Sequence, residues 1–177
     1  VANQVKQLHS DLRIVVPAAG AVADAVLHAV RDWETPPLVI DPRTNPDQAQ
    51  TDKRAAFAAA DVALAASGTV SLELAAARTP MVIAYDMHWL TRMIMKRMLL
   101  IDTVTLVNLV SDTRVIPEFI GKDCRADKIA PAVLDVLAHP DRQLDAMATT
   151  MKRLGEGGDP PGLRAALAVL KRLPDAK

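Results

Sequence analysis

The sequence predicts an α/β fold: a Rossmann-like parallel sheet with helices on both faces, followed by C-terminal helices. Two observations support this prediction. Short apolar runs of strand length alternate with stretches of helical periodicity as far as residue 108. These runs are apolar almost throughout, which is typical of parallel strands that are buried on both faces. Half of the 177 residues are hydrophobic, enough for a single core.

Each element follows from local signals in chain order. The first strand is bounded by Pro17 and Gly20, the second lies between prolines, and Pro80 ends the helix before the fourth. The expected strands are residues 12–18, 36–42, 62–67, 81–85 and 103–108. The expected helices are residues 20–33, 54–60, 69–78, 88–100, 114–120, 125–138, 141–154 and 162–173. We expect a domain over residues 1–154, then a linker and C-terminal helix over 155–177. The first residues have the pattern of the end of an amphipathic helix, so a piece of a longer protein is expected.

Bulk composition excludes several classes. The 21 basic and 21 acidic residues give a formal net charge of zero, which argues against a globally basic nucleic-acid binder. The single cysteine, Cys124, rules out an internal disulfide and suits a reducing compartment. The start lacks the pattern of a signal peptide, and no apolar run is long enough to span a bilayer.

The strand-to-helix turn Ser67-Gly68-Thr69 is the first candidate for a binding site. Glycine lets a ligand approach the backbone closely, and a helix start offers unpaired N–H groups to phosphate. Glu73 shares a helix face with Thr69 and can accept hydrogen bonds from the vicinal hydroxyls of a ribose. Helix capping by Thr69 is the alternative. A capping box, however, needs Glu or Gln at the position of Leu72, so Glu73 comes one residue late.

Two later segments carry further polar candidates. Tyr85 ends the fourth strand and Met87 follows it, and the Met-rich stretch 87–100 either packs on the sheet or offers an apolar face to an acyl chain, a membrane or a partner helix. Asn108 is expected at a strand end. Glu118 is expected in the first turn of a short helix, where a surface carboxylate favoured by the helix dipole is the simpler interpretation.

Other catalytic patterns are missing from the sequence. The four histidines have no zinc-ligand spacing, and no nucleophile elbow, P-loop or G-x-G-x-x-G is present. Cys124 has no evident base beside it and is expected to be passive. We therefore expect no metal and no other cofactor.

Taken together, the segments SGTVSLELAAARTPMVIAYDMHWLT and TVTLVNLVSDTRVIPEFI resemble the C-terminal half of lipid-A-disaccharide synthase. The motifs that carry the resemblance are S-G-T-x-x-L-E, T-P-M-V-x-x-Y-x-M and the N-L segment that ends in P-E, in the family's order and spacing. The likeness is close over residues 61–137 and looser outside them.

The resemblance implies the C-terminal domain of a GT-B fold and an inverting glycosyltransferase. Such an enzyme joins UDP-2,3-diacylglucosamine to 2,3-diacylglucosamine 1-phosphate through a β-1,6 linkage in lipid A synthesis. It implies a cytoplasmic enzyme peripheral to the inner membrane, compatible with a homodimer, without a metal. The residues to which it assigns nucleotide binding are Ser67, Gly68 and Thr69 for the diphosphate, Glu73 for the ribose, Tyr85 and Met87 for the donor pocket, and Asn108 and Glu118 for the rest of the nucleotide side.

Departures from the family pattern limit what this chain is expected to do. Asp86 stands where the family usually has Arg, and Phe119-Ile120-Gly121 replaces the usual end of the P-E-L-x-Q segment. The family's L-P-G-S-R loop and the N-terminal domain, with the catalytic base, would lie upstream of Val1. No residue of this chain is therefore assigned a catalytic role. The chain is expected to bind the UDP of the donor at most and not to turn over alone, because the base and the second substrate-holding domain are elsewhere.

Two other functions remain open from sequence. Another GT-B enzyme, such as a UDP-GlcNAc 2-epimerase or a GlcNAc transferase of the murein type, shares the strand–glycine–helix–Glu pattern. A non-catalytic interaction domain would instead use the Met-rich stretch 87–100 as its partner surface.

Overall fold

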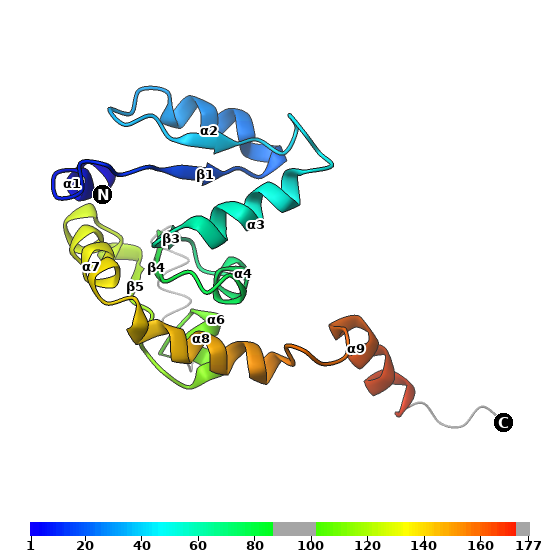
Figure 1. Ribbon diagram of the computed structural model, residues 1–177. Helices are drawn as coiled ribbons and strands as arrows, with labels where there is room; N and C mark the ends of the chain where they lie inside the picture. The colour runs from blue at the N-terminus through cyan, green and yellow to red at the C-terminus, as the bar shows by residue number, and fades with distance from the viewer. Residues whose placement is uncertain (87–101, 173–177) are drawn as a thin grey trace.

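The computed structural model describes residues 1–86 and 102–172, and its strands are all parallel. β1 (Val15–Pro17) pairs with β2 (Leu38–Ile40), and β3 (Ala63–Ala65), β4 (Met81–Tyr85) and β5 (Glu118–Ile120) form a second sheet in the order β3-β4-β5. Figure 1 shows helices packed around these strands. The predicted α/β fold is confirmed, in the form of short parallel sheets flanked by helices.

The three-stranded sheet separates two apolar clusters. On one side, Met81 and Ile83 of β4 pack with α4 (Val70–Ala76), α6 (Leu106–Ser111) and α8 (Asp141–Leu154). On the other side, Val82 packs with α1 (Ala2–Lys6) and α7 (Ala126–Ala138). Since side chains alternate along a strand, the unbroken apolar run of β4 serves both clusters. All three of these β4 residues have no exposed surface.

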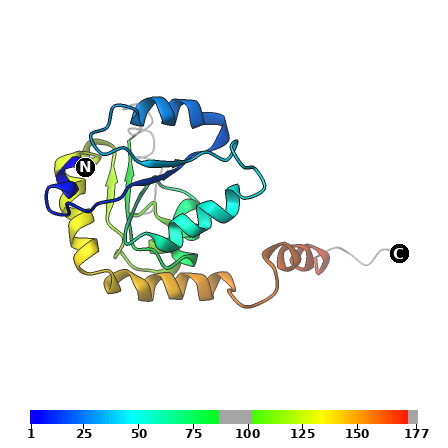
Figure 2. The same cartoon turned by 45° about the horizontal axis from the view of Figure 1, so that its top comes forward.

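The β1–β2 pair carries its own helices. The short 3-10 helix η1 (Gly20–Val22) leads into α2 (Ala23–Val30), and α3 (Ala49–Ala59) contacts both β1 and β2. α3 begins earlier than the sequence predicts: it starts at Ala49, so the largely polar residues before Arg54 are already helical. Figures 1 and 2 show α3 running from the end of the β1–β2 pair toward the three-stranded sheet.

Two predicted elements are wrong. Residues 103–108 do not form a strand: the backbone is extended as far as Thr105, and α6 then begins at Leu106. Residues 114–120 do not form a helix, because Glu118–Ile120 is the edge strand β5 and pairs with Ile83–Tyr85 of β4. Asn108 therefore lies inside a helix and Glu118 inside a strand, the reverse of the expectation for each.

The physical reason lies in where the backbone finds partners. The amides of Val104 and Thr105 donate to the Glu118 carboxylate rather than to a neighbouring strand. Pro117 disfavours helical geometry at the residue before it, and the carbonyl of Pro117 accepts the amide of Ile83 at the open edge of β4. The pairing with β4 therefore selects Glu118–Ile120 as the strand in place of residues 103–108.

The C-terminal helices agree with the sequence pattern. α7 and α8 match residues 125–138 and 141–154 closely. Gly155 ends α8 with a left-handed backbone, φ 90°. α9 (Pro161–Leu170) then projects from the rest of the molecule, and none of its residues is buried. The predicted helix 88–100 falls outside the described residues. Within those residues, no helix combines the length and apolarity needed to cross a bilayer.

Candidate functional site

The turn between β3 and α4 presents an open stretch of backbone. Gly68 has φ 140°, a conformation that residues with a Cβ rarely adopt, and no heavy atom lies within 4 Å of the position that a Cβ would take. Among the described residues, the side of Gly68 toward which a Cβ would point is therefore open, although the residue itself is half-buried. The glycine satisfies the geometric condition for close approach of a ligand.

Thr69 does not act as a side-chain cap. It occupies the N-cap position of α4, yet its hydroxyl makes no capping hydrogen bond and the residue is exposed. The hydroxyl of Ser71 instead donates to the carbonyl oxygen of Gly68 over 2.8 Å and holds the turn. The capping interpretation of Thr69 is thus wrong, and Thr69 is an exposed residue next to Gly68.

Ser67 has a structural partner. Its hydroxyl donates to the carbonyl oxygen of Val104 over 3.0 Å, so the turn after β3 is tied to the extended segment before α6. These two positions are 37 residues apart in the chain. Ser67 therefore fixes the position of Gly68 and Thr69 relative to the rest of the site.

Glu73 is on the exposed side of α4, in its first turn. Its carboxylate forms an ion pair with Lys53 of α3, with Nζ and Oε2 2.6 Å apart, while its side chain stays 42% exposed. The ammonium of Lys53 also lies 5.9 Å from the ring centroid of Phe57. Exposed ion pairs contribute little stability, so a ligand hydroxyl can compete for this carboxylate at low cost.

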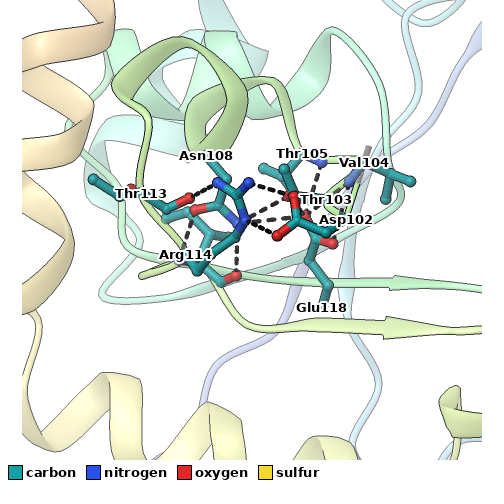
Figure 3. Close-up of polar contacts among 9 residues, drawn as sticks. Asp102, Thr103, Val104, Thr105, Asn108, Thr113, Arg114 and Glu118 are labelled. Atoms are coloured by element: carbon teal, nitrogen blue, oxygen red, sulfur yellow. Dashed lines mark hydrogen bonds and ion pairs between the residues drawn. The ribbon is translucent and has the colours of Figure 1, made fainter. Parts of the chain in front are cut away.

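Asn108 and Glu118 come together in a polar cluster beside the start of β5 (Figure 3). Asn108 is buried in α6, where its amide pairs with the backbone of Ile116: Nδ2 donates to the carbonyl oxygen and Oδ1 accepts from the N–H, both over 3.0 Å. Nδ2 also lies 3.3 Å from the Oγ1 of Thr103 and from the Oε1 of Glu118. Asn108 thus joins α6 to the strand that follows.

The Glu118 carboxylate is the acceptor at the centre of this cluster. It receives the Thr103 hydroxyl, the amide of Thr105 over 2.8 Å and the amide of Val104 over 3.2 Å, all visible in Figure 3. Burial raises the pKa of Glu118, but these hydrogen bonds together outweigh burial and hold the pKa below its ordinary value. Glu118 is therefore ionised near neutral pH. Its hydrogen bonds hold residues 103–105 in place, and Val104 in turn accepts the hydroxyl of Ser67 in the turn that carries Gly68.

An exposed ion pair extends the cluster toward solvent. The guanidinium of Arg114 contacts both carboxylate oxygens of Asp102, with Nε 3.0 Å from Oδ2. Hydrogen bonding to Arg114 lowers the pKa of Asp102. Arg114 also donates to the carbonyl oxygen of Thr113, so both ends of the loop around α6 are linked (Figure 3).

The structure thus divides the predicted residues into two groups. Gly68, Thr69, Glu73 and Tyr85 present open backbone or exposed side chains around the ends of β3 and β4. Ser67, Asn108 and Glu118 are engaged in hydrogen bonds within the chain. Met87 lies outside the described residues. Among those residues, no cluster of three or more His, Cys, Asp or Glu side chains is arranged to hold a metal ion.

Three residues that support this site are not predicted from sequence. The pattern assigns Thr103 and Thr105 to a strand, and it places Lys53 in a polar segment leading into a helix. The T-x-T spacing next to Asn108 is the available signal for the two threonines. It is ambiguous because alternating threonines are as typical of a strand as of a segment bound to a carboxylate.

Comparison with known proteins gives a consistent result. The family model described as lipid-A-disaccharide synthetase matches residues 1–160. A lipid-A-disaccharide synthase of Ruegeria pomeroyi is 61% identical over 94% of this chain, which covers 42% of that relative. Those of Paramagnetospirillum magneticum and Rhodospirillum centenum are 44% and 41% identical over 90% and 92% of the chain, which covers 40% and 39% of their lengths. The chain therefore spans about two fifths of these relatives, and it belongs to the lipid-A-disaccharide synthetase family.

Proposed function

We propose that the full-length protein is a lipid-A-disaccharide synthase and that this chain supplies the part of it that holds the donor nucleotide. In this proposal the enzyme transfers 2,3-diacylglucosamine from its UDP conjugate to 2,3-diacylglucosamine 1-phosphate and releases UDP. The observation that carries it is the family match over residues 1–160, together with the open glycine turn at the carboxyl end of β3. Ligands of open parallel sheets bind beyond the carboxyl ends of the strands.

The donor contacts in this proposal come from the exposed group. The backbone of Gly68 and the hydroxyl of Thr69 hold the diphosphate, Glu73 accepts hydrogen bonds from the ribose hydroxyls, and Tyr85 lines the donor pocket. Met87 is assigned to the same pocket by the resemblance. Ser67, Asn108 and Glu118 are then positioning residues, because their polar atoms are already used to hold the turn and the 103–105 segment in place.

Partners and location belong to the same proposal. The lipid acceptor places the full-length enzyme at the cytoplasmic face of the inner membrane as a peripheral protein, and a homodimer is compatible with it. The catalytic base is assigned to the part of the enzyme that this chain does not cover. This chain on its own is proposed to bind donor and not to turn over.

Titration calorimetry with UDP tests the binding half of the proposal. Glu73→Gln should weaken UDP binding at least about tenfold, the equivalent of one charge-assisted hydrogen bond. Lys53→Met is the matched control, because it removes the same ion pair and keeps the carboxylate. It should bind UDP as well as the parent chain. Equal affinity of the Glu73→Gln variant and the parent would refute the ribose assignment.

A product assay tests the catalytic half. The full-length enzyme should form the disaccharide and release UDP only when both acylated substrates are supplied. The same enzyme with Glu73→Gln should lose transfer to the same extent as it loses UDP affinity. Turnover of unacylated UDP-GlcNAc without a lipid acceptor would refute the lipid A assignment.

A further inference from the structure

The carboxyl ends of β3, β4 and β5 lie next to one another. Ala65 of β3, Ile83 of β4 and Glu118 of β5 are side by side in the register of the sheet. β5 continues to Ile120, which lies opposite Tyr85 at the end of β4. The residues that follow β5 therefore reach the same edge of the sheet as the glycine turn after β3, with the end of β4 between them.

Gly121 turns the chain at the end of β5. Its φ is 61°, a left-handed conformation that favours glycine, and the residue is buried. The chain then forms the short 3-10 helix η2 (Gly121–Asp123), after which the amide of Cys124 donates to the carbonyl oxygen of Gly121 over 2.9 Å. Lys122 is the exposed residue of this helix, since Asp123 is half-buried. A defined turn thus places a lysine at the edge that the candidate site occupies.

The turn after β3 brings no positive charge of its own. Residues 66–70 contain no charged side chain, and the charged groups that follow at the ends of β3 and β4, Glu73 and Asp86, are carboxylates. A phosphate group bound at this edge adds further negative charge. Proteins stabilise bound phosphate with a cation, and lysine does so as a compact point charge. A lysine or arginine from a neighbouring element is therefore expected to contact the ligand.

The other cations near this edge already hold carboxylates. Each of them forms an ion pair within the described chain: Lys53 with Glu73, Arg114 with Asp102, Arg125 with Asp127, and Lys128 with Asp123. Lys122 differs from them. Within residues 1–86 and 102–172, its ammonium is paired with no carboxylate.

Asp123 does not neutralise Lys122, although the two are adjacent in the chain. The Asp123 carboxylate is hydrogen-bonded to the ammonium of Lys128 of α7, and this bond is the main reason why the pKa of Asp123 lies below its ordinary value. Lys122 acts on the same carboxylate only through its charge, and more weakly. The ammonium of Lys122 is thus available to another anion.

Lys122 can reach a ligand that lies above the end of β4. Neighbouring strands are about 4.8 Å apart, so β3 and β5 are separated by about 10 Å. The ammonium of Lys122 stands on a flexible four-carbon stem, and the open side of Gly68 lies across β4 from it. The two can therefore contact one ligand from opposite sides of β4.

We propose that Lys122 binds a phosphate group of the substrates above the end of β4. The inference rests on the proposed function, in which both substrates carry phosphate: the donor as a diphosphate and the acceptor as a 1-phosphate. A point charge suits either group, because it imposes no planar geometry on its partner. Lys122 is then a binding residue beyond those that hold the donor through Gly68, Thr69 and Glu73.

Substitution of Lys122 in the full-length enzyme tests the proposal. Lys122→Met removes the charge and keeps most of the stem, and Lys152→Met, at an exposed position in the last turn of α8, is the matched control. Titration calorimetry with UDP and with uridine examines the donor. If the donor diphosphate is the ligand, Lys122→Met weakens UDP binding at least about tenfold and leaves uridine binding unchanged, because uridine has no phosphate.

Initial rates of disaccharide formation examine the acceptor. If its 1-phosphate is the ligand, Lys122→Met leaves UDP binding unchanged and raises the KM for 2,3-diacylglucosamine 1-phosphate at least about tenfold. In either case Lys122→Arg keeps the charge and should retain most of the affinity, and the effect of Lys122→Met should shrink as the salt concentration rises. Either pattern supports the proposal and identifies the source of the phosphate.

Two results would overturn the proposal and leave the proposed function intact. One is that Lys122→Met and Lys152→Met have the same UDP affinity and the same acceptor KM. The other is an equal loss of UDP and uridine binding in Lys122→Met, since the lysine would then act on the fold and not on phosphate. Failure of the proposed function would differ from both: the enzyme without substitutions would neither bind UDP nor form the disaccharide, and the proposal would fall with it.

Discussion

Glu118 offers the sharpest test of how the site is built, through the variant Glu118→Gln. The carboxylate accepts the Thr103 hydroxyl and the amides of Val104 and Thr105. Glutamine keeps one acceptor oxygen and replaces the other with an NH₂ group that faces the Val104 amide. Hydrogen bonds to a charged group contribute about 1.5–3 kcal/mol each. Since the site is half-buried and one acceptor survives, we expect the free energy of unfolding to fall by about 2 kcal/mol.

The pH dependence of this effect has a definite sign. Folding lowers the pKa of Glu118, so its contribution to stability is fully present above the unfolded-state pKa and is lost as pH falls through the lower folded-state pKa. The difference in unfolding free energy between the parent and Glu118→Gln should therefore be constant from neutral pH down to about pH 5 and shrink at lower pH.

Urea denaturation followed by circular dichroism across this pH range measures the effect. Glu156→Gln, at an exposed position after α8, is the matched control and should change stability by less than about 0.5 kcal/mol. Two results would refute the reasoning: equal unfolding free energies for the two variants near neutral pH, or a difference that grows as the pH is lowered.

Three further predictions use the same denaturation measurement. Thr103→Val should lower the unfolding free energy by about 1 kcal/mol through loss of its bond to Glu118, whereas the exposed Thr51→Val should change it by less than about 0.5 kcal/mol; equal effects of the two would contradict the cluster as described. Gln143→Leu should lower the unfolding free energy by about 3 kcal/mol, since the buried Gln143 amide pairs with both the N–H and the carbonyl of Met81. A loss no greater than that of Gln50→Leu, at an exposed position, would show that this pairing is unimportant. Gly68→Ala should lower the unfolding free energy by about 1–2 kcal/mol and weaken UDP binding, because the φ of Gly68 is 140°. Gly162→Ala, which is equally uncrowded but lies inside α9, should leave the unfolding free energy unchanged or raise it. Similar effects of the two substitutions would contradict the argument from backbone conformation.

Local patterns were sufficient for the elements whose burial matches their periodicity. Met81–Tyr85 is apolar at nearly every position and is a central strand, while the helical spacing of α7 and α8 predicted their bounds within a residue. The turn from Ser67 to Thr69 was also recognisable, because a glycine between an apolar strand and a helix is typical of a tight strand-to-helix connection. These features depend on neighbours a few residues away in the chain.

The tertiary structure alone decided which segment becomes the edge strand beside β4. Residues 103–108 have the composition of a strand, yet Glu118–Ile120 is the strand, and the Glu118 carboxylate accepts the amides of Val104 and Thr105 across more than ten residues. The same is true of the division between exposed and engaged site residues: Asn108 and Glu118 look alike as polar candidates, but their partners come from distant positions. Sequence thus determined the fold class and the glycine turn, because local backbone preferences act there. The roles of the polar side chains were decided by long-range hydrogen bonds, which no local pattern encodes.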